Sequence, residues 1–196
     1  MLAGGASHRF EGNKAAVIGP LVLSAFRAAG IDPVVAIGGV PGVLPIPTIA
    51  DRYPGEGPLG AIATALTFAR TGYVIVATCD LPCLDAAALE AVQSRASAVD
   101  PTTAVVAAIG GHPQLSLGAW PASWSTAVHR AMRSGERRLR HMLDLGEIEQ
   151  VEIEPLALAD ADDRNTLATL LAEGRPSAGP ATGTDRDMPD PSSPGA

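Results

Sequence analysis

Several residue types are scarce in this sequence, and each shortage excludes a class of protein. Aromatic residues make up only 4% of the 196 residues, which predicts a core of Ala, Val and Leu. The two cysteines, Cys79 and Cys83, form no C-x-x-C motif and have no histidine nearby, so we expect core thiols in a reducing cytoplasm and not a metal site. No basic leader precedes an apolar stretch, and no apolar run reaches about eighteen residues, which predicts neither a signal peptide nor a membrane span.

Positive charge is scarce as well. The formal net charge is −7, which argues against a nucleic-acid binder, because such a protein normally carries a basic face. An acidic protein can still bind a small anionic substrate through a local cluster of cations. Lys14 is the only lysine in the chain, and the other thirteen cations are arginines. The surroundings of this lysine are therefore informative.

Residues 2–14, L-A-G-G-A-S-H-R-F-E-G-N-K, form a glycine-led segment that ends in this lysine. Gly4 and Gly5 let backbone N–H groups approach an anion closely, because neither residue carries a Cβ. Arg9 and Lys14 can neutralise phosphate oxygens. The spacing matches neither a Walker loop nor a dinucleotide-binding fingerprint. The segment indicates a nucleoside-triphosphate cradle; the alternative is a mobile N-terminal turn with two solvated cations.

Strand and helix patterns alternate along the chain, which predicts an open, mostly parallel α/β sheet with helices on both faces. Ligands of such sheets bind at the carboxyl ends of the strands. The glycine loop should follow a first, central strand, yet Met1 and Leu2 leave almost no residues for it. We therefore expect a truncated first strand and a true start upstream of Met1. The expected helices cover residues 20–29, 59–69, 86–96, 124–132, 136–145 and 162–171, and the expected strands cover residues 33–37, 73–78, 103–109 and 150–153.

Two acidic residues are candidates for ligand binding. Asp80 follows the strongest buried strand, where a carboxylate is costly unless it is paired or binds a cation. Mg²⁺ favours one or two carboxylates together with substrate phosphates, so Asp80 is the candidate metal ligand; the alternative is an N-cap of the following turn. Asp51 precedes the Gly57-Pro58 turn into a helix and can accept hydrogen bonds from N1–H and the exocyclic amine of guanine; ordinary turn chemistry is the alternative.

A dense cationic stretch lies near the C-terminal third of the chain. Residues 133 and 137 would lie one turn apart on a helix, so several arginines could share one face. We expect Arg137 and Arg138 to capture a phosphorylated second substrate; a solvated amphipathic helix is the alternative. Asp162 is a candidate second metal contact or the N-cap of the last helix. The arginines of this stretch are Arg130, Arg133, Arg137, Arg138 and Arg140.

Several segments resemble nucleotidyltransferases of the molybdenum cofactor guanylyltransferase type, in the order in which that family has them. The glycine loop matches the signature L-A-G-G-x-S-x-R-M-G-x-D-K but departs from it at Phe10, Glu11 and Asn13. Residues 79–82 resemble the C-D-x-P motif whose Asp binds Mg²⁺. Residues 51–61 resemble the family's Asp followed by a G-P-L-x-G turn into a helix, and His112-Pro113 and residues 135–138 resemble its later H-P and G-E-R-R segments. The matching loop residues are Leu2, Ala3, Gly4, Gly5, Ser7, Arg9 and Lys14.

The resemblance implies transfer of GMP from Mg·GTP to the terminal phosphate of molybdenum-bound molybdopterin, with release of pyrophosphate. It also implies a cytoplasmic enzyme that makes transient contacts with molybdoenzyme-maturation proteins and binds neither nucleic acid nor membrane. Two alternatives remain: another nucleotidyltransferase, acting with CTP on the same cofactor or on a sugar 1-phosphate, and a nucleotide-binding protein without turnover. The implied nucleotide-binding residues are Leu2, Ala3, Gly4, Gly5, Lys14, Asp51 and Asp80, and the implied catalytic residues are Arg9, Lys14 and Asp80, with Mg²⁺ on Asp80.

The resemblance and the composition together divide the chain into two parts. We expect one nucleotidyltransferase domain over residues 1–173. Residues 174–196 are rich in Pro, Gly, Ser, Thr and Asp and have no apolar periodicity. Such a segment cannot bury enough apolar surface to offset its ordering entropy, so we expect a disordered tail.

Overall fold

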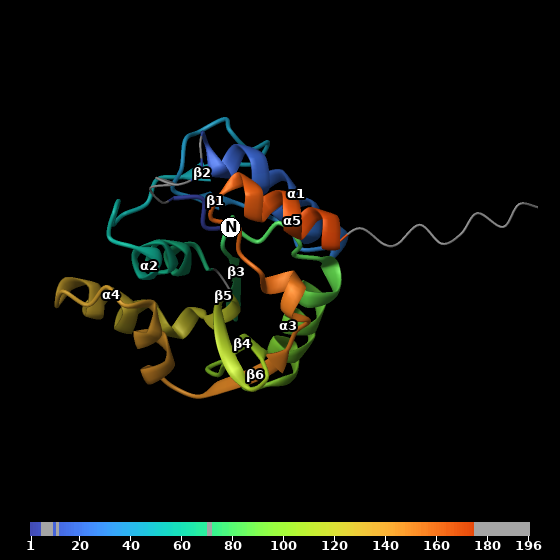
Figure 1. Ribbon diagram of the computed structural model, residues 1–196. Helices are drawn as coiled ribbons and strands as arrows, with labels where there is room; N and C mark the ends of the chain where they lie inside the picture. Colours follow the sequence, from blue (N-terminus) through green and yellow to red (C-terminus); the bar gives the residue numbers. More distant parts are fainter. Residues whose placement is uncertain (5–9, 11, 70–71, 175–196) are drawn as a thin grey trace, which may run out of the picture.

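The computed structural model describes residues 1–4, 10, 12–69 and 72–174 (Figure 1). The predicted tail at residues 175–196 lies outside the described residues and stays a prediction. The α-helices are α1 (Lys14–Ala28), α2 (Pro58–Phe68), α3 (Ala86–Ala98), α4 (Ser125–Arg133) and α5 (Arg164–Glu173). The strands are β1 (Ala36–Ile37), β2 (Thr48–Ile49), β3 (Tyr73–Ala77), β4 (Ala104–Ile109), β5 (His112–Pro121) and β6 (Ile148–Glu152), and short 3-10 helices are η1 (Ala122–Trp124), η2 (Leu139–Asp144) and η3 (Pro155–Leu158).

The strands form one mostly parallel arrangement in two hydrogen-bonded parts. β1 pairs with β2 in parallel, and the larger part has the order β3-β5-β4-β6. β4 and β6 are parallel, whereas β5 runs antiparallel to both β3 and β4. The predicted open, mostly parallel sheet is confirmed, with β5 as the antiparallel exception.

Leu2 joins the two parts of the sheet. It forms parallel bridges to Ile37 on one side and to Thr78 on the other. The Leu2 N–H donates to the carbonyl oxygen of Ala77 at 2.9 Å, and the Ala3 N–H donates to that of Ile37 at 2.9 Å. The residues in front of the glycine loop therefore hold the central position that the sequence predicts for a first strand.

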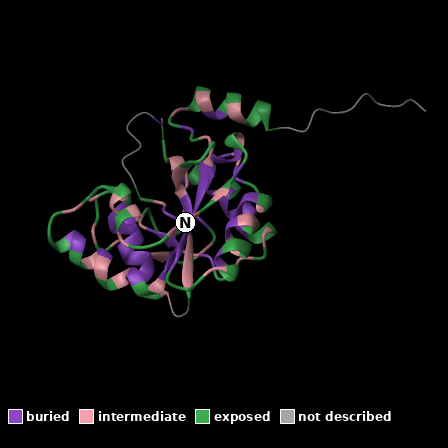
Figure 2. Cartoon of the chain, turned by 90° about the horizontal axis from the view of Figure 1, so that it is seen from below, coloured by how far each residue is buried: buried purple, intermediate pink, exposed green. Residues whose placement is uncertain are grey.

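Helices cover both faces of the sheet, as the sequence predicts (Figures 1 and 2). Neighbouring strand residues point to opposite faces, so Val105 belongs to one core cluster and Val106 to the other. The first cluster takes residues from α1, α3 and α5, and the second takes residues from α2 and α4. Figure 2 shows the buried positions gathered along the sheet and on the inner sides of these helices.

Several elements differ from the expectation: α1 begins earlier, β2 and β5 were not expected, and residues 139–144 form a 3-10 helix. α1 begins at Lys14 and not at Pro20, because the Asn13 side chain caps the helix by accepting the Ala16 N–H at 3.2 Å. The sequence indicated a start at the proline, since proline is common in the first turn of a helix. β5 was not expected, because a proline near each end of His112–Pro121 argues against a central strand. Its pairing with β3 and β4 overrides that local signal.

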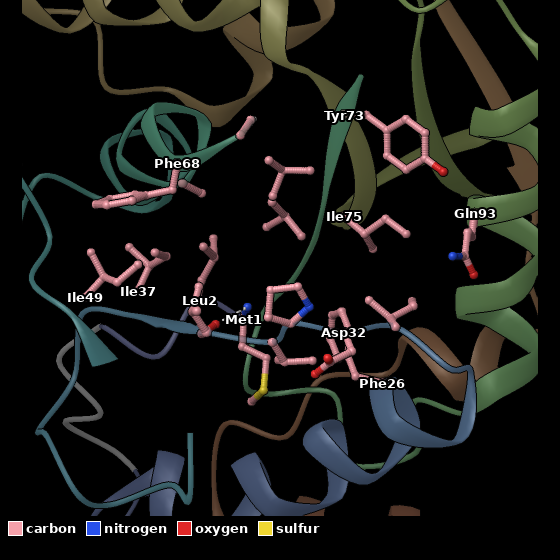
Figure 3. A pocket seen from close by; sticks show the side chains of 18 of the residues that line it. Met1, Leu2, Phe26, Asp32, Ile37, Ile49, Phe68, Tyr73, Ile75 and Gln93 are labelled. Carbon is pink, nitrogen blue, oxygen red and sulfur yellow. Dashed lines mark hydrogen bonds between the residues drawn. The ribbon is translucent and has the colours of Figure 1, made fainter. Parts of the chain in front are cut away.

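An apolar cavity of about 510 Å³ lies next to Met1 and Leu2 (Figure 3). Residues 30–35 and β3 form its opposite walls, and Asp32 and Gln93 are among its few polar lining residues. The N-terminal amine of Met1 donates to the carbonyl oxygen of Val35 at 2.9 Å. Burial lowers the pKa of this amine to about 6. The cavity therefore borders Met1 and Leu2, which connect the two parts of the sheet.

Candidate active site

A cleft of about 600 Å³ opens where Leu2 and β3 end. It lies at the carboxyl ends of parallel strands, where open α/β sheets bind their ligands. Among the residues predicted to bind a nucleotide, the cleft brings together Leu2, Gly4, Asp51 and Asp80. The remaining lining residues are Gly38, Gly39, Pro54, Gly55, Gly57, Pro58, Ala61, Thr78 and Cys79.

The floor of the cleft is made of backbone segments that approach too closely for side chains. A Cβ added to Gly38 would lie 3.1 Å from Cα of Gly4, and one added to Gly39 would lie 2.9 Å from the carbonyl oxygen of Ala3. Both glycines also have positive φ angles, +71° and +78°. Glycine is therefore required at both positions by the φ angles and by the close packing of residues 38–39 against residues 3–4, which leaves backbone groups at the surface of the cleft.

Lys14 brings two carboxylates together beside this cleft. Its Nζ atom lies 3.7 Å from Oδ2 of Asp80 and 3.1 Å from Oδ1 of Asp162. The lysine side chain is only 11% exposed although it stands at the first turn of α1. Lys14 thus forms ion pairs with two carboxylates, that of Asp80 after β3 and that of Asp162 before α5.

The rest of the predicted phosphate loop is described only in part. Gly5 and Arg9 lie outside the described residues, so their predicted roles stay predictions. Phe10 is buried, and the guanidinium of Arg164 lies 5.5 Å from its ring centroid. Arg164 at the start of α5 therefore lies over Phe10, and Asp162, just before this helix, reaches Lys14.

Asp163, and not Asp162, caps the last helix. The Asp163 carboxylate accepts the N–H groups of Asn165 at 2.9 Å and Thr166 at 2.8 Å. The expectation of Asp162 as an N-cap was wrong, because neighbouring aspartates give the same sequence signal for a cap. The structure assigns the two acids different contacts: Asp163 holds the helix and Asp162 reaches Lys14.

Cys79 sits in the wall of the cleft next to Asp80. Burial, together with the negative charge of Asp80, raises the pKa of its thiol to about 11. The thiol therefore stays protonated at neutral pH and is no nucleophile. Both cysteines are free and half-buried: Cys79 packs against the core, as predicted, whereas Cys83 lies outside the core clusters and its thiol donates to the carbonyl oxygen of Leu170.

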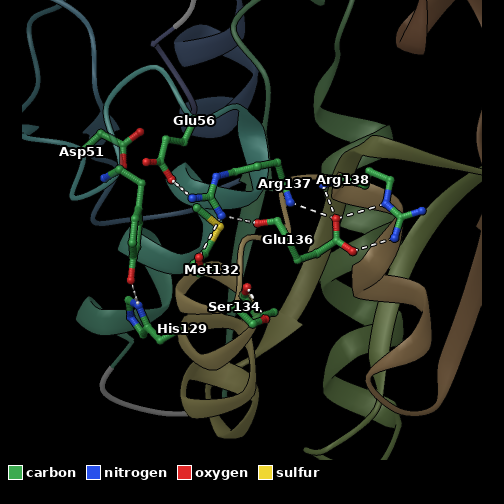
Figure 4. Close-up of polar contacts among 10 residues, drawn as sticks. Asp51, Glu56, His129, Met132, Ser134, Glu136, Arg137 and Arg138 are labelled. Atoms are coloured by element: carbon green, nitrogen blue, oxygen red, sulfur yellow. Dashed lines mark hydrogen bonds and ion pairs between the residues drawn. The ribbon is translucent and has the colours of Figure 1, made fainter.

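Asp51 is held by its own loop and by α2. Its Oδ1 atom accepts the Tyr53 N–H at 3.0 Å and the Thr64 hydroxyl at 2.8 Å. The Tyr53 hydroxyl in turn lies 2.9 Å from Nδ1 of His129, whose Nε2 lies 3.1 Å from the Thr67 hydroxyl (Figure 4). This chain of contacts connects the cleft wall to α2 and α4.

The two predicted substrate arginines have different partners (Figure 4). The Arg137 guanidinium pairs with Oε2 of Glu56 at 2.7 Å and donates to the carbonyl oxygen of Met132 at 2.8 Å. The Arg138 guanidinium is 82% exposed and pairs with Oε2 of Glu136 at 2.7 Å. Hydrogen bonds from Arg138 and Arg137 hold the pKa of Glu136 well below its usual range. Arg137 lies beside the cleft, since its carbonyl oxygen is 3.8 Å from the Cβ position of Gly57, and Arg138 follows it in the sequence.

The prediction that Arg133 and Arg137 share one helix face is wrong. α4 ends at Arg133, Gly135 has a φ of +92°, and the next helical turn is η2 at Leu139–Asp144. Arg133 and Arg137 therefore do not share a helix face. The break itself agrees with the two separate helices that the sequence predicts, 124–132 and 136–145. Glu56 and Thr64 were missed as site residues, because their partners are distant in the sequence.

The donor set suits a magnesium ion that a substrate brings with it. Within residues 1–4, 10, 12–69 and 72–174, no three His, Cys, Asp or Glu side chains come together to hold a metal ion. Mg²⁺ sites of nucleotide enzymes use one or two carboxylates and complete their coordination with phosphates and water. Asp80 and Asp162, which already converge on one cation, match this pattern.

An open α/β sheet with a glycine floor, a helix N-terminus and paired carboxylates at its carboxyl edge defines a nucleotide-binding protein of the doubly wound class. Comparison with protein families narrows this class. Residues 1–173 match the MobA-like NTP transferase domain, and the chain belongs to this family.

Individual relatives agree with the family. The chain is 35% identical over 89 residues to a molybdenum cofactor guanylyltransferase of Pseudomonas syringae, which covers 45% of this chain and 44% of the relative. It is 37% identical over 93 residues to a protein of Carboxydothermus hydrogenoformans named "probable molybdenum cofactor guanylyltransferase", which covers 44% and 47%. The matches thus span less than half the length of these curated relatives.

A solved structure confirms the fold. Molybdopterin-guanine dinucleotide biosynthesis protein A from Archaeoglobus fulgidus superposes with a TM-score of 0.68 at 19% identity, covering 86% of this chain and 94% of that one. At this identity the likeness establishes the architecture alone. Among the described helices, none is long and apolar enough to cross a membrane.

Proposed function

We propose that the protein transfers GMP from Mg·GTP to the terminal phosphate of molybdenum-bound molybdopterin and releases pyrophosphate. The observation that carries this proposal is the convergence of Asp80 and Asp162 on Lys14 at the edge of the glycine-floored cleft. Family membership and the names of the two curated relatives support the same reaction class.

The reaction needs positioning and charge neutralisation more than covalent help. An oxygen of the acceptor phosphate attacks the α-phosphorus of GTP, and the bond from that phosphorus to the bridging oxygen of pyrophosphate breaks. The attacking phosphate oxygen is already anionic, so no general base is required. Bound Mg²⁺ would neutralise charge on the phosphates, with Asp80 and Asp162 as the protein ligands.

Lys14 and the loop in front of it supply the remaining positive charge. When the two carboxylates hold a metal ion, the Lys14 ammonium is free to contact phosphate oxygens from the first turn of α1. Arg9 is the second proposed phosphate contact. The backbone N–H groups at the glycine floor and at the α1 N-terminus add donors that require no side chain.

Base recognition falls to Asp51, and acceptor binding falls to the arginine segment. Asp51 lines the cleft beside the Gly57-Pro58 entry into α2, and a carboxylate there accepts the N1–H and exocyclic amine of guanine. Arg138 presents the more open guanidinium, and Arg137 follows the same edge of the cleft. Bidentate arginine suits a dianionic phosphate.

The test is a pyrophosphate-release assay with GTP, CTP, ATP and UTP, each with Mg²⁺ and molybdenum-loaded molybdopterin. The expected result is release with GTP that depends on both the metal and the acceptor. Faster release with CTP would overturn the choice of base and keep the reaction class. Equilibrium binding of nucleotides without release for any of the four would overturn the transfer itself.

A further inference from the structure

A fully buried threonine lies behind the candidate base-reading carboxylate. Thr64 on α2 has no exposed surface, and the helix residues around it, 59–66, are otherwise apolar or glycine. Its hydroxyl lies 2.8 Å from Oδ1 of Asp51 and 3.0 Å from the Gly60 carbonyl oxygen, and it accepts the Arg52 N–H at 3.0 Å. Burying a hydroxyl in an apolar helix costs free energy, and these contacts offset that cost.

The contacts fix one oxygen of the carboxylate and leave the other open. Oδ1 of Asp51 accepts both the Thr64 hydroxyl and the Tyr53 N–H. None of the described residues donates a hydrogen bond to Oδ2, and Asp51 lines the cleft. The Tyr53 contact comes from the same turn, so it moves with Asp51. The Thr64 contact comes from α2 and anchors the carboxylate to a rigid element.

We propose that Thr64 is a positioning residue that orients the Asp51 carboxylate and thereby sets the preference for guanine over adenine. The inference rests on the proposed function, in which Asp51 contacts the base. Guanine offers N1–H and an amine as donors, whereas N1 of adenine is an acceptor and repels a carboxylate. Discrimination by such a group depends on its staying in place. A carboxylate that can rotate turns away from adenine and no longer excludes it.

The same helix supplies a control for ordinary threonine behaviour. Helical threonine commonly bonds to the carbonyl four residues earlier, and Thr67 does so with Ala63 at 3.2 Å. Thr67 also contacts His129 but has no contact with Asp51. A general effect of losing a helical hydroxyl would therefore appear in both positions, and an effect through Asp51 would appear at Thr64 alone.

The experiment compares Thr64→Val, Thr64→Ser and Thr67→Val with the wild type. The readout is the ratio of the ATP to the GTP dissociation constant, measured by titration calorimetry with Mg²⁺, together with the same ratio of kcat/KM in pyrophosphate release. We expect Thr64→Val to lower the guanine preference at least tenfold, which is about 1.4 kcal/mol. Both ratios should stay within about twofold of the wild type in Thr64→Ser, because serine keeps the hydroxyl, and in Thr67→Val, because Thr67 does not contact Asp51.

Asp51→Asn separates the two levels of the hypothesis. If the preference is unchanged in Asp51→Asn, the carboxylate does not read the base, and the proposed function loses its base assignment together with the role of Thr64. If the preference for GTP over ATP is lost in Asp51→Asn but unchanged in Thr64→Val, only the role of Thr64 is overturned. Equal losses in Thr64→Val and Thr64→Ser would show a packing effect and overturn it too. Should the valine variant lose its circular dichroism spectrum, Thr64→Ala takes its place under the same criteria.

Discussion

Glu56 and Arg137 are 81 residues apart in sequence, and their side chains meet at 2.7 Å across the edge of the cleft. Glu56 belongs to the loop whose Gly55 and Gly57 line the cleft, and Arg137 belongs to the segment that follows α4. Arg137 also donates to the carbonyl oxygen of Met132 at the end of that helix. The pair therefore fixes the nucleotide-side loop to the arginine-bearing segment.

Breaking this pair should weaken GTP binding. Each side chain is about two-fifths exposed, so the expected loss is moderate, about fivefold in the apparent KM for GTP, or roughly 1 kcal/mol. Glu56→Gln and Arg137→Met should raise the apparent KM for GTP by similar factors. The double variant should raise it no further than the single variant with the larger effect, because each single change already breaks the pair. Arg138→Met is the control, because its partner is Glu136 and not the loop. A normal KM for GTP in both single variants would show that the pair does not shape the cleft.

Replacing Lys14 or Asp80 by alanine should abolish most turnover without unfolding the protein. Loss of a preorganised charge from a phosphoryl-transfer site costs roughly 3–4 kcal/mol, which is two or more decades in kcat. We expect this of Lys14→Ala and of Asp80→Ala, measured by pyrophosphate release. Arg95→Ala removes a cation with an ion pair to Glu149 outside the cleft and should retain full activity. Near-wild-type rates in the Lys14 and Asp80 variants, with intact circular dichroism, would place the site elsewhere.

Two neighbouring aspartates should separate stability from activity. Asp163→Ala removes the N-cap of α5 and should cost about 1 kcal/mol, which lowers Tm by roughly 2–4 °C in a chain of this length. Asp162→Ala removes the carboxylate beside Lys14 and should lower kcat with little change in Tm. Differential scanning fluorimetry and the release assay, applied to both variants, distinguish these outcomes. The reverse pattern would contradict the assignment of the two acids.

Stability should depend on the protonation of His129. Burial, with the positive charges of Arg52 and Arg133, lowers the pKa of its imidazole below the ordinary 6.5. The unfolded chain therefore binds a proton at higher pH than the folded chain, so the free energy of unfolding rises with pH between the lowered pKa and 6.5. We expect stability to fall as the pH decreases through this window.

Urea unfolding at stepped pH measures this dependence. His129→Gln should have a shallower slope below pH 6.5 than the wild type, because its titrating group is gone. His112→Gln, a change of an exposed histidine on the β4–β5 turn, should retain the wild-type slope. The contribution of His129 is ruled out if its variant and the wild type follow the same curve.

The sequence predicted the parts of the fold that depend on local pattern. The continuous apolar run at β3 and the apolar spacing of α2 identified both elements to within a residue or two. The position of Asp80 after the most apolar strand predicted that it lies at the ligand-binding edge of the sheet, and it lines the cleft there. The antiparallel β5 escaped prediction because its prolines obscure a strand that only its two neighbours stabilise. The helix expected over residues 136–145 is a 3-10 helix at Leu139–Asp144, so its arginines do not continue a face of α4.

Contacts between distant residues could not be predicted in the same way. Thr64 in an alanine-rich helix carries no sign of its carboxylate partner, and Glu56 gives no sign of Arg137. Lys14 is the instructive exception, since its rarity and its place after paired glycines marked it before any geometry was known. Even so, its pairing with Asp162, 148 positions away, follows only from the packing of α5.

A ligand in the cleft would contact Leu2, the residue that connects the two parts of the sheet. The Leu2 N–H donates to Ala77, the Ala3 N–H donates to Ile37, and the Cys79 N–H donates to Leu2, so this segment connects the β1–β2 part of the sheet to β3. Leu2 and Gly4 also line the cleft, on the same short segment. A bound nucleotide would therefore stabilise the contact between the two parts of the sheet. We expect its addition to slow hydrogen exchange at the amides of Leu2, Ile37 and Cys79 more than exchange within β4.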